Sequence, residues 1–234
     1  MSKPEDDAIK GFKQAAADLA ATQIEDGMIV GLGSGTTATL AVASIGKRVA
    51  EGLKIIGIPT SEKTADQARL LNIPLSTLEE HSAIDVTIDG ADEVELGTLN
   101  LIKGGGGNLL REKIVAVASA RMIVVVDERK LVGELGIRFA VPVEVVPFGW
   151  KTTMSRLEQL GAQPTLRLRP DGEVLLTDGG HYILDCAFGA IRSPRDLQAD
   201  LDSIVGVVEH GLFLGIASKA IVGGSDGVKC LNRD

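Results

Sequence analysis

The segment "MIVGLGSGTTATLAVASIGKRVA" (residues 28–50) decides the fold, because it joins a short apolar strand to a helix through a glycine-hydroxyl loop. The next residues repeat this order. "KIIGIPTS" (54–61) is predicted to be a second strand and "EKTADQARLL" (62–71) a second helix. Strands that alternate with helices predict right-handed crossovers and a mainly parallel sheet.

The core must be built from aliphatic side chains. Hydrophobic residues make up 44% of the 234 residues and aromatic residues only 3%. Such a composition favours β-branched strands that are buried on both faces and covered by helices. We therefore predict an α/β fold, with an open, mainly parallel sheet and helices on both faces.

The same alternation continues through the first half of the chain. A helix is expected at 5–24, before the first strand, and another in "NLLREKIVAVASA" (108–120). Three further strands of the sheet are predicted in "AIDVTIDG" (83–90), "LNLIKGGGG" (99–107) and "RMIVVVDERK" (121–130).

The pattern changes after about residue 138, which predicts a second, smaller lobe. Its expected order is strand, helix, a hairpin at 164–177, strand, a helix capped by Ser193, and a last strand "GVVEHGLFLGI" (206–216). This order is close to a ferredoxin-like α+β lobe with one short extra strand. The expected boundaries are 1–138 and 212–234 for the main domain, which the tail rejoins, and 139–211 for the lobe.

Charge and cysteine content exclude several classes of protein. The net charge is −8, which argues against a broad surface for nucleic acid or an anionic membrane. No apolar run reaches membrane-spanning length, and the N-terminus has no secretory signal pattern. Cys186 and Cys230 lack the spacing of a zinc site or a disulfide framework. We predict a cytoplasmic protein without nucleic-acid or membrane partners.

Polar clusters follow three of the predicted strands. In parallel sheets ligands bind beyond the carboxyl ends of the strands, so these clusters are expected to meet at one edge. The clusters are Ser34, Gly35, Thr36 and Thr37 after the first strand, Asp89 and Asp92 after the third, and Lys103 with Gly104 to Gly107 after the fourth.

The loop "GLGSGTT" (31–37) is not a dinucleotide fingerprint. The motif G-x-G-x-x-G requires glycine where Thr36 stands, and the second strand does not end in an acid. The remaining possibility is a helix N-terminus with free amides and hydroxyls, suited to a single phosphate group. A tight turn capped by Ser and Thr explains the loop equally well.

The acidic and glycine-rich motifs also have ordinary explanations when each is taken alone. "DGADE" is typical of an Asx-turn, "KGGGG" of a flexible turn, and Glu112 of a solvated helix charge. Four ordered glycines are costly in backbone entropy, however, which suggests a close approach to a ligand. Glu112 is about one turn from Asn108 and can face back over the glycines. Together, the motifs favour a binding site.

At these residues the sequence resembles ribose-5-phosphate isomerase of the A type. The resemblance is carried by "GLGSGTT", "DGADEV", "LIKGGGG", "LLREK" and "GVVEHGLF", and it extends over nearly the full chain. It implies metal-independent interconversion of D-ribose 5-phosphate and D-ribulose 5-phosphate in the non-oxidative pentose phosphate pathway. It implies no cofactor, a small pentose phosphate as the partner, and a homodimer or homotetramer.

The resemblance also implies roles for individual residues. Glu112 corresponds to the general base, which would transfer a proton between C2 and C1 through an enediolate. Lys103 would stabilise the developing negative charge. Asp89 and Asp92 would hold sugar hydroxyls, and Lys13 could lie near the phosphate. The implied substrate-binding residues are Ser34, Gly35, Thr36, Thr37, Asp89, Gly90, Ala91, Asp92, Lys103, Gly104, Gly105, Gly106 and Lys130.

Other functions compete with this interpretation. A sugar-phosphate sensor would need a DNA-binding segment, but the predicted sheet begins by about residue 28. A phosphosugar hydrolase or deaminase would rely on histidine, whereas His81, His181 and His210 lie outside the motifs. A magnesium enzyme could use Asp89 and Asp92, but a nearby lysine disfavours a second cation.

Overall fold

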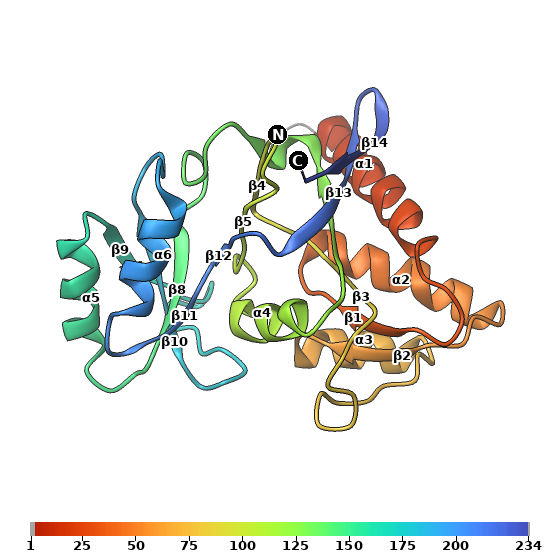
Figure 1. Cartoon of the computed structure of the whole chain (residues 1–234), viewed down its shortest axis with the longest axis horizontal. Coiled ribbons are helices and arrows are strands. Elements are labelled where there is room, and N and C mark those ends of the chain that lie inside the picture. The colour runs from red at the N-terminus through yellow and green to blue at the C-terminus, as the bar shows by residue number, and fades with distance from the viewer. Residues whose placement is uncertain (1–2, 234) are drawn as a thin grey trace.

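The computed structural model describes residues 3–233, which form a larger unit and a smaller lobe (Figure 1). Within these residues the strands form three sheets. The helices are α1 (Lys3–Ala21), α2 (Thr36–Ala50), α3 (Glu62–Leu70), α4 (Leu109–Val117), α5 (Trp150–Gln159) and α6 (Pro194–Asp202), with the 3₁₀ helix η1 (Glu128–Lys130).

The main sheet has the strand order β14-β13-β6-β3-β1-β2. All neighbouring strands are parallel except β14, which forms an antiparallel hairpin with β13. The predicted α/β class and the return of the tail to this sheet are confirmed. The strands are β1 (Ile29–Leu32), β2 (Ile56–Pro59), β3 (Val86–Asp89), β6 (Met122–Asp127), β13 (Ala217–Gly224) and β14 (Gly227–Asn232).

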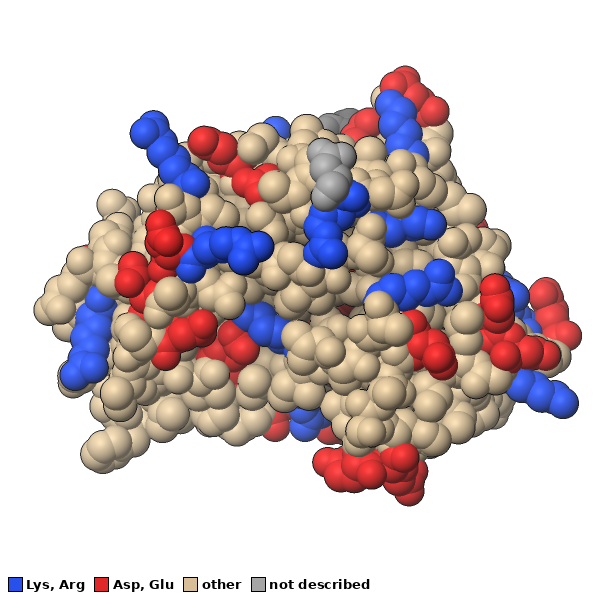
Figure 2. All heavy atoms as spheres, in the orientation of Figure 1, with Lys and Arg blue, Asp and Glu red and all other residues tan. Residues whose placement is uncertain are grey.

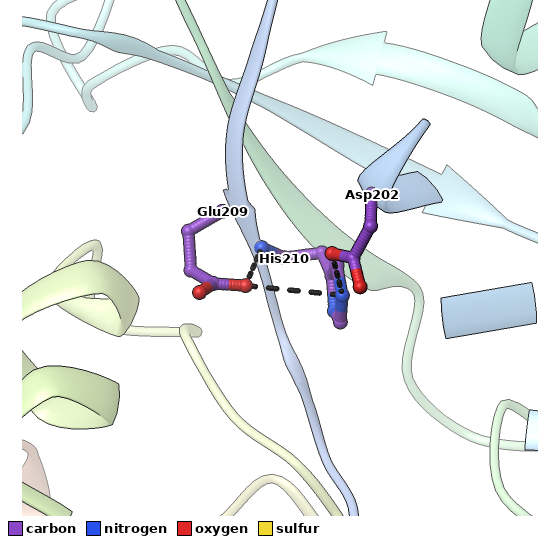
Figure 3. Close-up of side chains that lie close together, drawn as sticks. All are labelled: Asp202, Glu209 and His210. Carbon is purple, nitrogen blue, oxygen red and sulfur yellow. Dashed lines mark hydrogen bonds and ion pairs between the residues drawn. The ribbon is translucent and has the colours of Figure 1, made fainter. Parts of the chain in front are cut away.

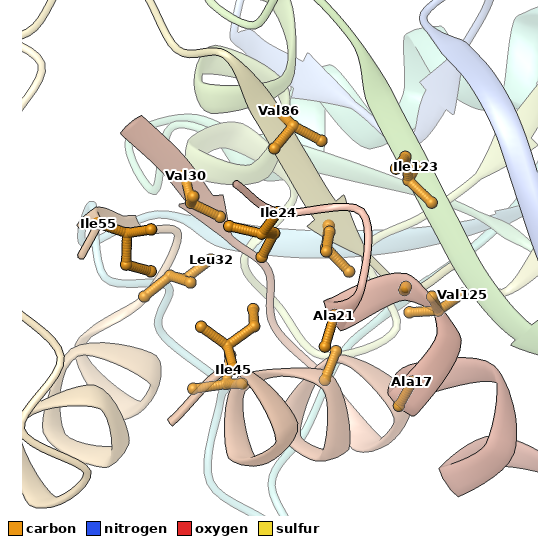
Figure 4. Packing of buried hydrophobic residues seen from close by; sticks show 14 of the residues in the cluster. Ala17, Ala21, Ile24, Val30, Leu32, Ile45, Ile55, Val86, Ile123 and Val125 are labelled. Carbon is orange, nitrogen blue, oxygen red and sulfur yellow. The ribbon is translucent and has the colours of Figure 1, made fainter. Parts of the chain in front are cut away.

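Apart from its largely exposed edge strand β14, the main sheet is buried on both faces, as its aliphatic strands predict. On one face α1 and α2 pack over Val30, Leu32 and Val86 (Figure 4). Successive residues of β6 point to opposite faces. Ile123 and Val125 therefore join this cluster, and Val124 joins a second cluster beneath α4. The strand ends are thus held at one rigid edge.

The prediction that the segment before Lys103 forms a fourth strand of the parallel sheet is wrong. The strand β5 (Leu101–Ile102) belongs to a separate sheet of order β12-β5-β4-β7, in which it pairs antiparallel with both neighbours. Its partners are β4 (Glu93–Glu95), β7 (Leu131–Val132) and β12 (Leu212–Phe213). A two-residue strand is too short for hydrophobic periodicity to identify its partners.

The lobe has the antiparallel strand order β11-β8-β10-β9. With α5 after β8 and α6 after β10, this is the ferredoxin-like arrangement that the sequence predicts. The prediction of a short extra strand is wrong. The second arm of the hairpin expected at 164–177 forms only an isolated bridge, between Leu168 and Val174. The strands are β8 (Val141–Val145), β9 (Gln163–Leu166), β10 (Tyr182–Ala187) and β11 (Val207–His210).

The single strand expected at 206–216 is divided at Gly211. The strand β11 lies in the lobe and β12 in the small sheet, so this segment connects the two. Lys103 donates its backbone amide to the carbonyl of Gly211 at 2.9 Å. A Cβ atom on Gly211 would lie 2.2 Å from the carbonyl of Lys103, so this crossing requires glycine. Ser193 occupies the N-cap of α6, but its side chain makes no capping hydrogen bond.

The surface carries both signs of charge. On the face seen in Figure 2, basic and acidic side chains are interspersed. None of the helices in the described part of the chain has the length and apolar character that crossing a membrane would require.

Candidate active site

A pocket lies where β1, β3 and β5 end, and it brings together the motifs that the sequence singles out. Its lining also includes Lys13, for which the family resemblance implies a place near the phosphate. Asp89 is fully buried behind this surface. The lining residues are Lys13, Ser34, Gly35, Thr36, Thr37, Gly90, Ala91, Asp92, Lys103, Gly104, Gly105, Gly106, Glu112 and Lys130.

The ammonium group of Lys103 is the centre of the pocket. Its Nζ lies 3.0 Å from Oδ2 of Asp89 and 3.2 Å from Oε2 of Glu112, and it donates to the carbonyl of Gly90 at 2.7 Å. Each of these three partners comes from a different segment than Lys103 itself. The side chain of Lys103 is only 3% exposed, so water screens these contacts weakly.

Burial and charge shift the pKa values of this cluster. Burial raises the pKa of Glu112 to about 8, because desolvation outweighs the opposing attraction of Lys103. Burial alone would lower the pKa of Lys103, but Asp89 and Glu112 more than offset this effect and raise it. Lys103 therefore stays charged, and Glu112 exchanges a proton near neutral pH.

The two aspartates of "DGADE" hold the surrounding loops. Oδ1 of Asp89 accepts the amides of Ser34 at 3.0 Å and Gly90 at 2.7 Å, which ties the first loop to the third. Oδ2 of Asp92 accepts the amide of Gly105 at 2.8 Å. Burial raises the pKa of Asp89, although Lys103 and these amides oppose the shift.

The N-terminus of α2 forms a cradle for an anion. Gly35 is the N-cap with φ of 92°, a conformation that favours glycine, and no side chain caps the first turn. Thr36 and Thr37 follow with their amides at this end of the helix. From α1, Lys13 donates its ammonium to Oγ1 of Thr36 at 3.1 Å. Amides, hydroxyls and a cation thus converge at a helix N-terminus, the arrangement that suits a phosphate.

Ser34 lines the pocket, and its hydroxyl contacts three other hydroxyl groups. Its Oγ lies 2.7 Å from Oγ1 of Thr60, 2.9 Å from Oγ of Ser61 and 3.2 Å from Oγ1 of Thr64. We call these four residues the hydroxyl cluster. Its members are buried and come from the loop after β1, the end of β2 and the start of α3. The hydroxyl of Ser34 therefore ties the loop to the start of α3.

Several residues near the pocket were missed by sequence reasoning. Asp127, at the end of β6, forms an ion pair with Arg129 at 2.6 Å and lies 3.8 Å from Lys13. Asp127 could have been predicted from the sequence, because it ends a predicted strand of the parallel sheet and ligands bind at such strand ends. Ser61 could have been found as the N-cap of α3, since it accepts the amide of Thr64 at 3.1 Å.

A separate cluster of possible metal ligands lies outside the pocket lining. Potential ligand atoms of Asp202, Glu209 and His210 lie within 4.8 Å of one another (Figure 3). The ammonium of Lys113 already contacts Oε1 of Glu209 at 2.5 Å. Nδ1 of His210 accepts the amide of Leu212, so its proton is on Nε2, facing Asp202. This cluster packs α4 against the lobe.

Comparison with known sequences identifies a matching family and relatives that carry the same name as that family. The profile of the family described as Ribose 5-phosphate isomerase A (phosphoriboisomerase A) matches residues 56–227. The chain is 56% identical over 223 residues to "Ribose-5-phosphate isomerase A" of Synechococcus sp. (strain JA-3-3Ab), covering 95% of this chain and 97% of the relative. It is 57% identical over 220 residues to the protein of that name from Gloeobacter violaceus, covering 94% and 95%.

Solved structures agree with the sequence relatives. A D-ribose-5-phosphate isomerase in complex with phospho-erythronic acid superposes with a TM-score of 0.93 at 40% identity, covering 96% of this chain and 99% of that one. Ribose 5-phosphate isomerase A of Methanocaldococcus jannaschii gives a TM-score of 0.91 at 40% identity, covering 95% and 99%.

Proposed function

Because the chain belongs to the ribose 5-phosphate isomerase A family and interconverts D-ribose 5-phosphate and D-ribulose 5-phosphate, we propose that the pocket around Lys103 is its active site. The observation that carries this proposal is the buried contact of Lys103 with Glu112, next to the cradle at the start of α2. The chemistry needs a proton acceptor, a fixed cation and a phosphate anchor, and each is supplied here.

In the proposed mechanism, Glu112 removes the proton from C2 of the open-chain aldose and returns a proton to C1. One carboxylate held over both carbons suffices for both transfers. Its raised pKa, about 8, makes Glu112 a stronger base than an exposed glutamate. Negative charge develops on the sugar oxygens of the enediolate, and Lys103 stabilises it in a site that water screens weakly.

The phosphate is assigned to the cradle of Gly35, Thr36 and Thr37, with Lys13 beside it. The complex of a relative with phospho-erythronic acid, a phosphorylated acid, supports a small phosphosugar as the ligand. Because the phosphate does not react, its binding energy serves to orient C1 and C2 toward Glu112. Ser34 contributes by fixing the shape of the loop through the hydroxyl cluster.

The remaining predicted residues have positioning and hydroxyl-binding roles in this proposal. Asp92 reaches the pocket surface and is placed to bind sugar hydroxyls, as are the backbone groups of Gly90 and Ala91. Asp89 is buried, so we assign it to holding Lys103 and the loops. Lys130 lines the pocket on the side of η1 and is assigned to substrate binding, together with Gly104 to Gly106.

We further propose a homodimer or homotetramer in the cytoplasm. Phe148 and Val205 of the lobe are 94% and 79% exposed, which suits a surface that another subunit covers. Both cysteines are free thiols, in keeping with a reducing compartment. The proposed lobe boundaries remain 139–211, and its strands extend from Val141 to His210.

The proposed chemistry is tested by isomerisation of D-ribose 5-phosphate in deuterated water. The expected result is ketose formation with deuterium entering at C1, because the proton on the carboxylate of Glu112 exchanges with solvent during some turnovers. Mass spectrometry of the product measures the incorporation. Ketose that forms without any deuterium, even from a prolonged incubation, would indicate a hydride shift and contradict the proposed base.

A further inference from the structure

The lobe contacts the glycine loop of the pocket through Arg167, which directly follows β9. Nη1 of Arg167 donates to the carbonyl of Gly104 at 2.6 Å and to that of Gly105 at 3.3 Å. Its side chain is only 12% exposed. A largely buried guanidinium that donates to two successive carbonyls holds a segment of backbone in one orientation.

Asp185 of β10 fixes the guanidinium from the opposite side. Nε of Arg167 donates to Oδ2 of Asp185 at 2.9 Å, and Nη2 donates to Oδ1. Two parallel hydrogen bonds to one carboxylate restrict both the position and the plane of an arginine. The backbone amide of Arg167 also donates to the carbonyl of Ile183 on β10, at 2.9 Å. The contact to the loop therefore starts from paired strands, which are rigid supports.

The glycine loop needs such external support. Gly104 has φ of +106°, and the loop has no side chains of its own between Lys103 and Asn108. In the peptide that joins Gly104 to Gly105, the carbonyl accepts from Arg167 and the amide donates to Asp92 at 2.8 Å. The two groups of a trans peptide point in opposite directions. Arg167 and Asp92 therefore hold this peptide plane from its two sides.

The orientation of these peptides matters for the charge that the reaction develops. A carbonyl oxygen turned toward the pocket would repel an anionic intermediate, whereas one held away leaves the positive end of the peptide dipole toward it. Arg167 binds the carbonyls of Gly104 and Gly105 on the lobe side. The amide of Gly106, in the second of these peptides, then faces away from Arg167, and Gly106 lines the pocket.

We propose that Arg167 is a positioning residue for the isomerase reaction, holding the glycine loop from the lobe so that its carbonyls stay turned away from the reacting sugar. The inference rests on the proposed active site. It gives the lobe a role in catalysis, because Arg167 and Asp185 belong to the lobe and the loop they hold belongs to the pocket. The effect of Arg167 is exerted through the backbone that follows Lys103.

The test compares Arg167→Met, Arg167→Lys and the control Arg169→Met. Arg169 is the next arginine along the chain and is 52% exposed, in a surface pair with Asp171. In Arg167→Met, kcat is expected to fall by about 10- to 100-fold, as for a small displacement of a catalytic group. KM should change less than about threefold, since the phosphate cradle is untouched. Arg167→Lys should recover little, because an ammonium cannot reproduce the planar fork.

A chemical rescue separates positioning from general stability. Addition of guanidinium at low millimolar concentration to Arg167→Ala should restore part of kcat, and sodium at equal ionic strength should not. Added guanidinium can restore activity only if the variant is folded and lacks nothing except the guanidinium group of Arg167. Asp185→Asn, which keeps Arg167 but weakens its support, should lower kcat less than Arg167→Met and tests the inference even if Arg167 variants do not fold.

The inference would be overturned by a folded Arg167→Met whose kcat stays within about twofold of the parent, or in which only KM rises. An unchanged kcat in Asp185→Asn together with unfolded Arg167 variants would also overturn it. Glu112→Gln, assayed in parallel, distinguishes the two proposals. An inactive Glu112→Gln beside a fully active Arg167→Met rejects only the role of Arg167, whereas an active Glu112→Gln rejects the proposed base.

Discussion

Oε2 of Glu112 lies 3.2 Å from Nζ of Lys103, and the two side chains are only 5% and 3% exposed. Lys103 is also paired with Asp89, so two almost fully buried carboxylates share one ammonium. This arrangement leaves Glu112 with a pKa of about 8. The proposed base is thus held beside the cation that would stabilise the intermediate it creates.

The first prediction concerns the pH dependence of kcat/KM. Since proton removal requires the carboxylate form, kcat/KM should rise about tenfold per pH unit up to about pH 8 and level off above it. Steady-state rates measured from about pH 5 to about pH 9 test this. The second ionisation of the substrate phosphate has a pKa near 6, low enough to be distinguished from the ionisation of Glu112 at about pH 8. A profile that is flat above about pH 6 would contradict the raised pKa of Glu112.

The second prediction is that Glu112→Gln loses turnover but keeps its substrate. The amide preserves shape but accepts no proton, so kcat should fall at least ~10²-fold, the low end for a lost general base. The dissociation constant for D-ribose 5-phosphate, measured by calorimetry, should change little. Glu128→Gln, at the start of η1, serves as a control outside the pocket lining. Near-normal turnover in Glu112→Gln would remove Glu112 from the role of base.

The third prediction is that Glu112→Gln is more stable than the parent, to an extent that depends on pH. In the folded state the pKa of Glu112 is raised from 4.5 to about 8, so the parent has its full stability below 4.5 and loses part of it as pH rises to about 8. The glutamine variant lacks this loss. The Tm of Glu112→Gln minus the Tm of the parent should therefore grow between these pH values and remain constant above them. A difference that shrinks as the pH rises would contradict the raised pKa of Glu112.

The fourth prediction is that Lys103→Met impairs both catalysis and stability. Turnover should fall more than affinity, because Lys103 acts on the charge of the intermediate. Removal of the ammonium also leaves Asp89 and Glu112 buried without their cation, and breaking such a buried pair costs about 3–5 kcal/mol. Chemical denaturation measures this loss. Lys47→Met, an exposed lysine in the last turn of α2, should change neither quantity appreciably. An effect confined to KM would mean that Lys103 only binds substrate.

The fifth prediction concerns the hydroxyl cluster around Ser34. Ser34→Ala removes the hydroxyl that contacts Thr60, Ser61 and Thr64, and the loss of a buried hydrogen bond whose partners keep other bonds costs about 0.5–1.5 kcal/mol. We expect a lower Tm and a raised KM, since the loop loses one of its links to α3 and keeps the bond from Thr64 to the carbonyl of Gly33. Ser203→Ala, an exposed serine that donates to the carbonyl of Asp200, is the control. A raised KM with unchanged Tm would instead indicate a direct contact of the Ser34 hydroxyl with phosphate.

Much of the site could be predicted from the sequence because its parts are local. The motifs at the ends of β1 and β3 follow strands whose aliphatic pattern is clear, and the rule for parallel sheets brings them together. Glu112 was expected over the glycine loop because it lies one turn from Asn108, and its amide does donate to the carbonyl of Asn108, at 2.9 Å. These predictions needed only the periods of strand and helix.

The predictions that failed depended on pairing between distant segments. The strand β5 joins a separate sheet because β4 and β12 offer it partners, which a two-residue apolar segment does not reveal. Lys103 nevertheless reaches the predicted edge, from that other sheet. Arg167 lies 63 residues from Gly104 along the chain, and its sequence surroundings give no sign that its side chain meets the loop.

The amino-acid sequence alone determined the α/β class, the ferredoxin-like order of the lobe and the chemical groups of the pocket, because helix and strand periods and loop motifs are properties of short segments. Only the tertiary structure decided that Ser34 turns toward α3, that Lys103 arrives from a second sheet and that Arg167 holds the glycine loop. Such contacts follow from the packing of elements that are far apart in the chain. The same packing buries Glu112, and its burial raises its pKa to about 8.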